Sequence, residues 1–248
     1  MIRAIGFDLD NTLFDHTQAA ADAMHQLIGQ KGWAYSGDES VGSKWHRIET
    51  TYFPQYAAGE MSLVDHRRAR MREFLESIDA GLDEDKLDEL WNDYVFHYSN
   101  AWAAYPDARD ALEALKAAGY KMDVLTNGQQ AQQEAKLKAM GIADMFEACL
   151  AIGTMEALKP DPKAFAHLCR VLDCEPNEVL FVGDDIDLDV RASINAGLQG
   201  VWLNRNGLKT PIGINREITT LAELGQSSIV EILPSNFGDQ FEFNKRHI

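Results

Sequence analysis

Near its start the chain reads Ile2-Arg3-Ala4-Ile5-Gly6-Phe7-Asp8, a largely apolar run that ends in a carboxylate. A run of this length fits a strand that is buried on both faces of a parallel sheet. Similar runs recur later in the chain, and helix-length stretches separate them. The expected strands are 2–7, 121–125, 146–152, 179–182 and 200–203, and the expected helices are 107–118, 131–140, 162–172 and 188–196. This alternation predicts an α/β fold with a doubly wound, Rossmann-like parallel sheet.

One long insertion interrupts the alternation. Residues 17–102 are far more than a βα loop needs, since such loops commonly take about two to six residues. Apolar side chains recur there at helical spacing, as at Trp45 and Ile48. The sequence therefore predicts an inserted helical cap domain at 17–102, a Rossmann-like core formed by 1–16 and 103–233, and a C-terminal tail at 234–248.

The composition limits the partners that the chain can have. A formal net charge of −16 repels nucleic-acid backbones, so we expect no polymeric nucleic acid partner. A small phosphate is not excluded, because one lysine and a few backbone N–H groups can hold it. We find no signal peptide and no apolar run of membrane-spanning length, so we expect a cytoplasmic protein without membrane contact. The odd number of cysteines predicts reduced thiols. The sequence gives no indication of the oligomeric state.

Polar residues follow the predicted strands at their carboxyl ends, where open α/β sheets bind ligands. Asp8 and Asp10 follow the first strand. Thr126 and Asn127 follow the second, in an expected turn whose hydroxyl and N–H groups suit phosphate oxygens, and Lys159 precedes the helix at 162–172. Each pattern alone also fits a structural role, namely a capping aspartate, an ordinary turn or a solvated lysine. Their joint place at strand ends favours a phosphate site.

A dense acidic segment follows the strand at 179–182. It reads Gly183-Asp184-Asp185-Ile186-Asp187-Leu188-Asp189. Solvation alone explains this density poorly at a βα junction, although a capped helix start is an alternative interpretation. Carboxylate oxygens suit Mg²⁺, which keeps several waters and takes one or two protein carboxylates. We therefore expect a magnesium site at this segment.

Together these motifs resemble those of the haloacid dehalogenase superfamily. The likeness spans nearly the whole chain and rests on Asp8-x-Asp10-x-Thr12, Thr126, Lys159 and Gly183-Asp184-x-x-x-x-Asp189, in that family's order and spacing. An insert after the first motif is similar to the family's helical-cap class. The phrases at 125–128, 195–197 and 202–204 look closest to its pyrimidine-type 5′-nucleotidases and small-metabolite phosphatases.

The resemblance implies a Mg²⁺-dependent phosphatase for small phosphomonoesters, with nucleoside 5′-monophosphates as the first substrates to consider. Asp8 would attack phosphorus and form an aspartyl-phosphate, and Asp10 would act as general acid and then as general base. Asp8, the backbone carbonyl of Asp10 and Asp184 would hold the metal ion. The expected partner is a small phosphorylated metabolite.

Phosphate-binding roles also follow from the resemblance. Thr126 and the Asn127 N–H would hold the oxygens of the phosphoryl group that is transferred. Lys159 would offset their charge and orient the nucleophile. Asp189 would position Lys159.

Supporting residues complete the expected site. Thr12 is expected to brace the first loop, Asp185 to support the metal site and Asp187 to cap a helix. In the insert, Trp45 is interpreted as cap core, while Arg70 and its neighbouring arginines are interpreted as a solvated helix face rather than as substrate contacts.

Two alternatives use the same motif residues. A phosphoglucomutase-like phosphotransferase would return the phosphoryl group to a sugar instead of to water. A catalytically silent phosphate-binding module would keep the fold without turnover, but the intact motif residues argue against it. A true dehalogenase would lack the second acidic residue of the first motif, so Asp10 argues against that activity.

Overall fold

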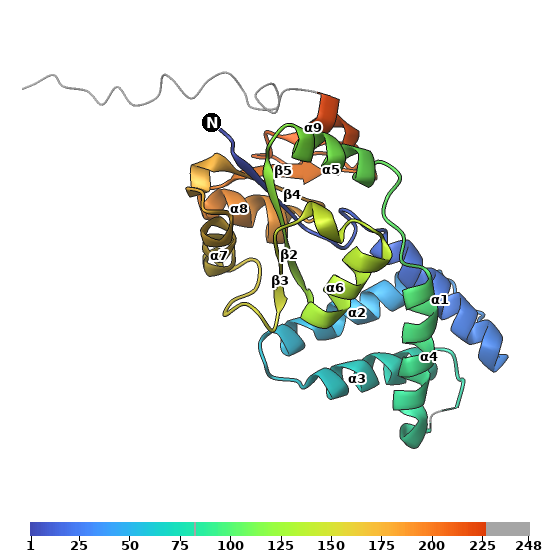
Figure 1. The fold of residues 1–248 in the computed structure, drawn as a ribbon. Coiled ribbons are helices and arrows are strands. Elements are labelled where there is room, and N and C mark those ends of the chain that lie inside the picture. Colours follow the sequence, from blue (N-terminus) through green and yellow to red (C-terminus); the bar gives the residue numbers. More distant parts are fainter. Residues whose placement is uncertain (82, 227–248) are drawn as a thin grey trace, which may run out of the picture. The chain divides into compact units, whose positions relative to one another are not determined.

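The chain folds into two compact units. A computed structural model describes residues 1–81 and 83–226 (Figure 1), so the tail expected at 234–248 lies outside the described residues. The first unit, named the sheet unit, comprises Met1–Asp8, Pro106–Asn127 and the described residues 144–226. The second, named the helical unit, comprises Leu9–Tyr105 and Gly128–Ala143. The limits of the cap at 17–102 stay a prediction.

The sheet unit is built on a sheet that has six strands in the described part of the chain. The strands run in the order β3-β2-β1-β4-β5-β6, and the pairs β1–β2, β1–β4, β4–β5 and β5–β6 are parallel. Because the order proceeds outward from β1 in both directions, the sheet is doubly wound and the predicted α/β class is confirmed. The strands are β1 Ala4–Phe7, β2 Lys121–Gln129, β3 Cys149–Ile152, β4 Val179–Gly183, β5 Gln199–Leu203 and β6 Glu217–Ile218.

Helices flank this sheet on both faces (Figure 1). Helix α5 packs with α9, and α7 packs with α8. These pairs lie on opposite faces, as the doubly wound order requires. The helices are α5 Ala108–Ala117, α7 Pro162–Leu172, α8 Ala192–Asn195 and α9 Ala222–Gln226, with a π-helical turn at Ile186–Arg191 and 3₁₀ turns at Ala143–Met145 and Pro176–Glu178.

Helix α7 illustrates how the sequence builds one of these layers. Asp161 caps its start, as its place before a proline predicts. The buried face of the helix packs on the sheet, where the Phe165 ring meets the Phe181 ring edge-on at 5.1 Å. Gly6 in β1 permits this approach, because a Cβ at that position would lie 2.6 Å from Cδ2 of Leu168. Burial of Phe165 contributes about 2–3 kcal/mol to stability.

Asp123, near the start of β2, is a buried titratable group in the sheet. Its Oδ1 accepts a hydrogen bond of 2.6 Å from the Ala148 N–H, and its Oδ2 has no hydrogen-bond partner among the described residues. Burial raises the pKa of Asp123 to about 6 from an ordinary 3.8. Between these two values the folded state binds the proton more tightly than the unfolded state, so Asp123 makes stability fall as pH rises.

We expect Asp123→Asn to flatten the pH dependence of stability. The raised pKa of Asp123 corresponds to a loss of about 2–3 kcal/mol of unfolding free energy as pH rises from about 4 to about 6. Urea unfolding across that range should show this decline in the wild type and a shallower one in the variant. The exposed Asp144 supplies the control substitution, Asp144→Asn, which should behave like the wild type. Parallel curves for Asp123→Asn and the wild type would contradict the assignment.

The helical unit contains α1 His16–Lys31, α2 Val41–Ala57, α3 Leu63–Glu76, α4 Leu87–Asn100 and α6 Gln130–Ala139, with a 3₁₀ turn at Glu84–Lys86. Side chains of Asp15, Ser40 and Ser62 cap the starts of α1, α2 and α3 by accepting backbone N–H hydrogen bonds. The helical periodicity expected within 17–102 is confirmed. Within the described ranges, no helix is both long enough and apolar enough to cross a membrane.

The core of the helical unit is aromatic and encloses a charge. Trp45 is fully buried, which confirms its interpretation as core. Arg70 is buried as well, so the prediction of a solvated face is wrong for this residue. Its guanidinium lies 4.6 Å from the Trp45 ring centroid and 4.9 Å from that of Trp91, and it pairs with Glu49. The ion pair and the two aromatic faces offset the cost of burying the charge.

Candidate active site

A buried lysine joins two carboxylates in the sheet unit. Lys159 Nζ lies 2.6 Å from Asp8 Oδ1 and 2.6 Å from Asp189 Oδ1. All three side chains are buried. Burial alone would lower the pKa of Lys159, but Asp189 and Asp8 outweigh it and hold that pKa above its ordinary value. The lysine is therefore a permanent cation between the two carboxylates at neutral pH.

The strand register brings these residues to one edge of the sheet. Phe7 is paired with Val124 of β2 on one side and with Val182 of β4 on the other. Asp8 therefore leaves β1 beside the carboxyl end of β4 and beside the part of β2 that follows Val124, and its N–H donates to the Val182 carbonyl at 2.9 Å. Thr126 stands near this end of β2 and Asp184 directly follows β4. The arrangement matches the ligand-binding edge of doubly wound sheets.

Asp184 adds a third carboxylate to this edge. Carboxyl oxygens of Asp8, Asp184 and Asp189 all lie within 4.8 Å of one another. Burial raises the pKa of Asp184 to about 8, and the charges of Asp8 and Asp189 add to the shift. Such crowding of acids is costly unless a cation is present.

This donor set fits a hard divalent cation. Asp189 already accepts from Lys159 and, at 3.1 Å, from the Asp185 N–H, so Asp8 and Asp184 are the two carboxylates suited to an ion. One or two carboxylates are what Mg²⁺ commonly takes from a protein. The Trp202 indole N–H donates to the Asp184 carbonyl at 2.9 Å and fixes that backbone. The Asp8 and Asp184 side chains therefore fit a hard divalent cation, and their role as metal ligands stays a prediction.

Asn127 braces the lysine loop, a role that the sequence did not reveal. Its side-chain amide donates to the Lys159 carbonyl at 2.8 Å and accepts from the Lys159 N–H at 2.9 Å. Thr126 beside it is buried. The flexible turn predicted at 126–128 is wrong, because β2 runs on as an extended strand to Gln129. Asn127 thus ties this end of β2 to the segment that carries Lys159.

The acidic segment after β4 is shaped around Asp189. Gly183 is needed there, because a Cβ at that position would lie 2.2 Å from Asp189 Oδ2. Asp185 caps the following turn, its Oδ1 accepting from two backbone N–H groups at 2.8 Å each. The cap predicted at Asp187 is therefore wrong, since Asp187 is exposed and pairs with Arg191 at 2.7 Å. The helix predicted at 188–196 accordingly begins at residue 186, as a π-helical turn that leads into α8.

Asp10 belongs to the helical unit and has two partners there. Lys136 Nζ lies 2.6 Å from its Oδ1, and Gln133 Nε2 donates to its Oδ2 at 3.0 Å. Burial alone would raise the pKa of Asp10, but Lys136 and His16 outweigh it and lower that pKa. Thr12 is fully buried in the turn after Asp10 and its N–H donates to the Leu9 carbonyl at 3.3 Å.

Lys136 and Gln133 were missed in the sequence, which shows only that they share one face of a predicted helix. Both fall in the helix predicted at 131–140, and residues three apart share a helix face. Both are buried, and the sequence does not show this because polar side chains at helical spacing are mostly exposed. His16 was missed as well; its Nδ1 lies 2.7 Å from the Tyr98 hydroxyl and its Nε2 lies 3.2 Å from Glu49.

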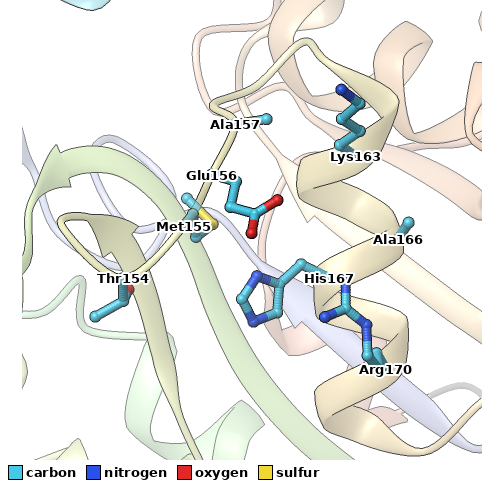
Figure 2. A pocket seen from close by; sticks show the side chains of 8 residues that line it. All are labelled: Thr154, Met155, Glu156, Ala157, Lys163, Ala166, His167 and Arg170. Carbon is cyan, nitrogen blue, oxygen red and sulfur yellow. The ribbon is translucent and has the colours of Figure 1, made fainter.

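A separate pocket of about 220 Å³ lies between α7 and the loop that precedes it (Figure 2). Glu156 comes from the loop, and Lys163, His167 and Arg170 come from the helix. The predicted site residues do not line this pocket. The cluster around Lys159, rather than this pocket, is therefore the candidate active site.

Comparison with known proteins agrees with this geometry. A family model described as haloacid dehalogenase-like hydrolase matches residues 2–197. N-acylneuraminate-9-phosphatase of Rattus norvegicus is 28% identical over 215 residues, which cover 83% of this chain and 84% of that protein. (S)-2-haloacid dehalogenase 4A of Burkholderia cepacia is 30% identical over 216 residues, which cover 83% and 84%.

A solved structure shows the same fold. The HAD-hydrolase YfnB of Bacillus subtilis, bound to magnesium, has a TM-score of 0.75 at 21% identity, covering 90% of this chain and 96% of that one. The span of the family model, residues 2–197, contains every predicted site residue from Asp8 to Asp189. From the sheet order, the acid–lysine cluster and this match, we conclude that the chain belongs to the haloacid dehalogenase-like hydrolase family.

Proposed function

We propose that the protein is a magnesium-dependent phosphatase that hydrolyses small phosphomonoesters through an aspartyl-phosphate on Asp8. The observation that carries the proposal is the buried Lys159, which lies 2.6 Å from both Asp8 and Asp189. A lysine fixed beside a nucleophilic carboxylate orients that carboxylate and offers positive charge to an incoming phosphate.

In the first step a carboxylate oxygen of Asp8 attacks phosphorus, and the bond from phosphorus to the leaving oxygen breaks. Lys136 and His16 lower the pKa of Asp10, so it takes up its proton only when the anionic phosphate lies beside it; it then gives that proton to the leaving oxygen, and the product leaves as an alcohol. The Thr126 hydroxyl and the Asn127 N–H hold the phosphoryl oxygens, and Lys159 offsets their charge. A magnesium ion bound by Asp8, Asp184 and the Asp10 carbonyl would supply further positive charge against the anionic phosphate.

In the second step water attacks the phosphorus of the aspartyl-phosphate. Asp10, now ionised, takes a proton from that water, and inorganic phosphate leaves with Asp8 restored as a carboxylate. Asp189 keeps Lys159 in place through both steps. The two steps consume one water and return every group to its starting state, with Asp10 again protonated.

Asp10 favours a phosphatase over a dehalogenase, although relatives of both kinds are similar to this chain. An alkoxide leaves slowly without a proton, whereas a halide needs none, so a general acid serves only the phosphatase. A transfer of the phosphoryl group to a sugar would use the same residues. We propose water as the acceptor because the rat relative is a phosphatase.

For the substrate we propose a small phosphorylated metabolite, with nucleoside 5′-monophosphates as the first class to test. The likeness of three short phrases to 5′-nucleotidases supports this class. The rat relative's name supports a sugar-acid phosphate as the second class. We also propose that the helical segment at 17–102 is the cap that selects among them.

We expect hydrolysis of p-nitrophenyl phosphate to require magnesium and to stop with a chelator. Asp184→Asn should raise the magnesium concentration for half-maximal activity by about tenfold or more, because one of the two fitting carboxylates is lost. Asp187→Asn is the matched control, since its side chain is exposed and pairs with Arg191. A panel of nucleotide and sugar phosphates then ranks the substrates. Undiminished hydrolysis in the presence of chelator would contradict the proposed metal requirement. Failure to hydrolyse any phosphate of the panel would contradict the proposed phosphatase function.

A further inference from the structure

Both oxygens of the Asp10 carboxyl accept hydrogen bonds from side chains of a single helix. Lys136 Nζ donates a hydrogen bond to Oδ1 at 2.6 Å, and Gln133 Nε2 donates one to Oδ2 at 3.0 Å. Both partners come from α6, and both are buried, whereas 28% of the Asp10 side chain is exposed. Two contacts on different oxygens fix the plane of a carboxyl group, which a single contact leaves free to rotate.

Residues around α6 leave room for Gln133 and hold the Lys136 ammonium in place for these two hydrogen bonds. A Cβ at residue 128 would lie 2.2 Å from Gln133 Nε2, so Gly128 provides the space that the amide occupies. The Lys136 ammonium lies 5.0 Å from the Phe14 ring centroid and 5.3 Å from that of Tyr98. Aromatic faces attract a cation and hold it without competing for its hydrogen bonds. Tyr98 is itself fixed by His16 at 2.7 Å.

Burying a lysine costs desolvation free energy, so a buried ion pair is a poor means of stabilising a fold. An ion pair of this kind commonly stabilises a protein no better than well-packed apolar side chains of the same volume. The stability of α6 would therefore be served as well by a methionine or leucine at residue 136. The presence of a cation there instead points to a requirement at the carboxyl group that it holds.

We propose that Lys136 and Gln133 are positioning residues that hold the Asp10 carboxyl in the orientation at which it protonates the leaving oxygen. The inference rests on the proposed phosphatase function. Each carboxyl oxygen has two lone-pair sites, and the two contacts take one site on each oxygen. The sites that remain serve the transferred proton. Lys136 touches no reacting atom in this scheme and acts only through Asp10.

The leaving group of the substrate separates this role from a structural one. The p-nitrophenolate ion leaves without a proton, whereas the alkoxide of a nucleoside or sugar phosphate does not. We therefore expect Lys136→Met to lower kcat/KM about 10²-fold for the nucleoside or sugar phosphate that the wild type hydrolyses fastest, and less than about tenfold for p-nitrophenyl phosphate. A merely structural role would lower both values by the same factor.

Four further variants make the experiment decisive. Asp10→Asn should show the same preference for the p-nitrophenyl ester, and the double variant with Lys136→Met should be no worse than Asp10→Asn alone, because the lysine acts through the acid. Lys138→Met is the matched control, an exposed lysine on the same helix, and should match the wild type. Gln133→Ala removes the other contact and replaces Lys136→Met if that variant fails to fold.

The outcomes distinguish the inference from the function on which it rests. A wild type that hydrolyses neither ester ends the proposed function and this inference with it. If the wild type is active and Lys136→Met lowers kcat/KM equally for both esters, or for neither, the inference is wrong and the proposed phosphatase function is unaffected. A selective loss on the alkyl ester, together with a non-additive double variant, is the result that we expect.

Discussion

Asp8→Asn is expected to lower kcat at least about 10⁴-fold while leaving the protein as stable as the wild type or more so. An amide cannot form the acyl-phosphate, so both steps of the reaction are lost. The fold should not suffer, because Asp8 is one of three crowded carboxylates and contributes to the raised pKa of Asp184. Lys159 keeps its second partner, Asp189.

Phosphate release and thermal unfolding measure the two halves of this prediction. Asp187→Asn, which changes an exposed carboxylate of the acidic segment after β4, should leave both unchanged. Loss of turnover at equal or higher stability is the pattern of a group retained for chemistry. Residual kcat within tenfold of the wild type would exclude Asp8 as the nucleophile.

Lys159→Met is expected to damage both stability and turnover. It leaves Asp8 and Asp189 buried without the cation that they share, which commonly costs about 3–5 kcal/mol. Loss of the charge that faces phosphate should lower kcat/KM by about 10²- to 10³-fold. The raised pKa of Lys159 means that its stabilising contribution is fully present below its unfolded value and is lost only as pH rises through the folded one.

The pH dependence of this variant identifies the cause of its instability. Without the lysine, Asp8 and Asp189 favour the protonated form in the folded state, so lowering the pH should restore part of the lost unfolding free energy. Urea unfolding at about pH 7.5 and about pH 5 compares the two proteins. Lys163→Met, at an exposed lysine nearby in α7, is the control. An unfolding free energy equal to that of the wild type at both values would refute the ion-pair account.

The sheet and its ligand-binding edge could be predicted because strong local patterns carry them. Apolar runs of strand length, separated by helices with recognisable ends such as Asp161 before Pro162, leave few topologies to consider. Asp8, Lys159 and Asp184 then follow, because parallel strands present their carboxyl ends at one edge. These residues lie close together in the structure as their place in the sequence leads one to expect.

Other features could not be predicted because they depend on packing between distant segments. Arg70 has the sequence pattern of a surface charge, and its burial is explained by distant residues, namely Glu49 and the two tryptophans beside it. Gly128 reads as a turn, but its real use is to admit the Gln133 side chain. Lys136 lies 126 positions from Asp10 in the chain, and no local pattern links the two.

Trapping the covalent intermediate tests the central claim most directly. Wild-type protein turning over a ³²P-labelled phosphomonoester with magnesium would be quenched in acid, and the labelled position would be identified by borohydride reduction and peptide mass spectrometry. We predict that label accumulates on Asp8, with up to one phosphoryl group per chain, and that Asp8→Asn carries none. Full turnover with no label on the protein, or with label on another residue, would contradict the account.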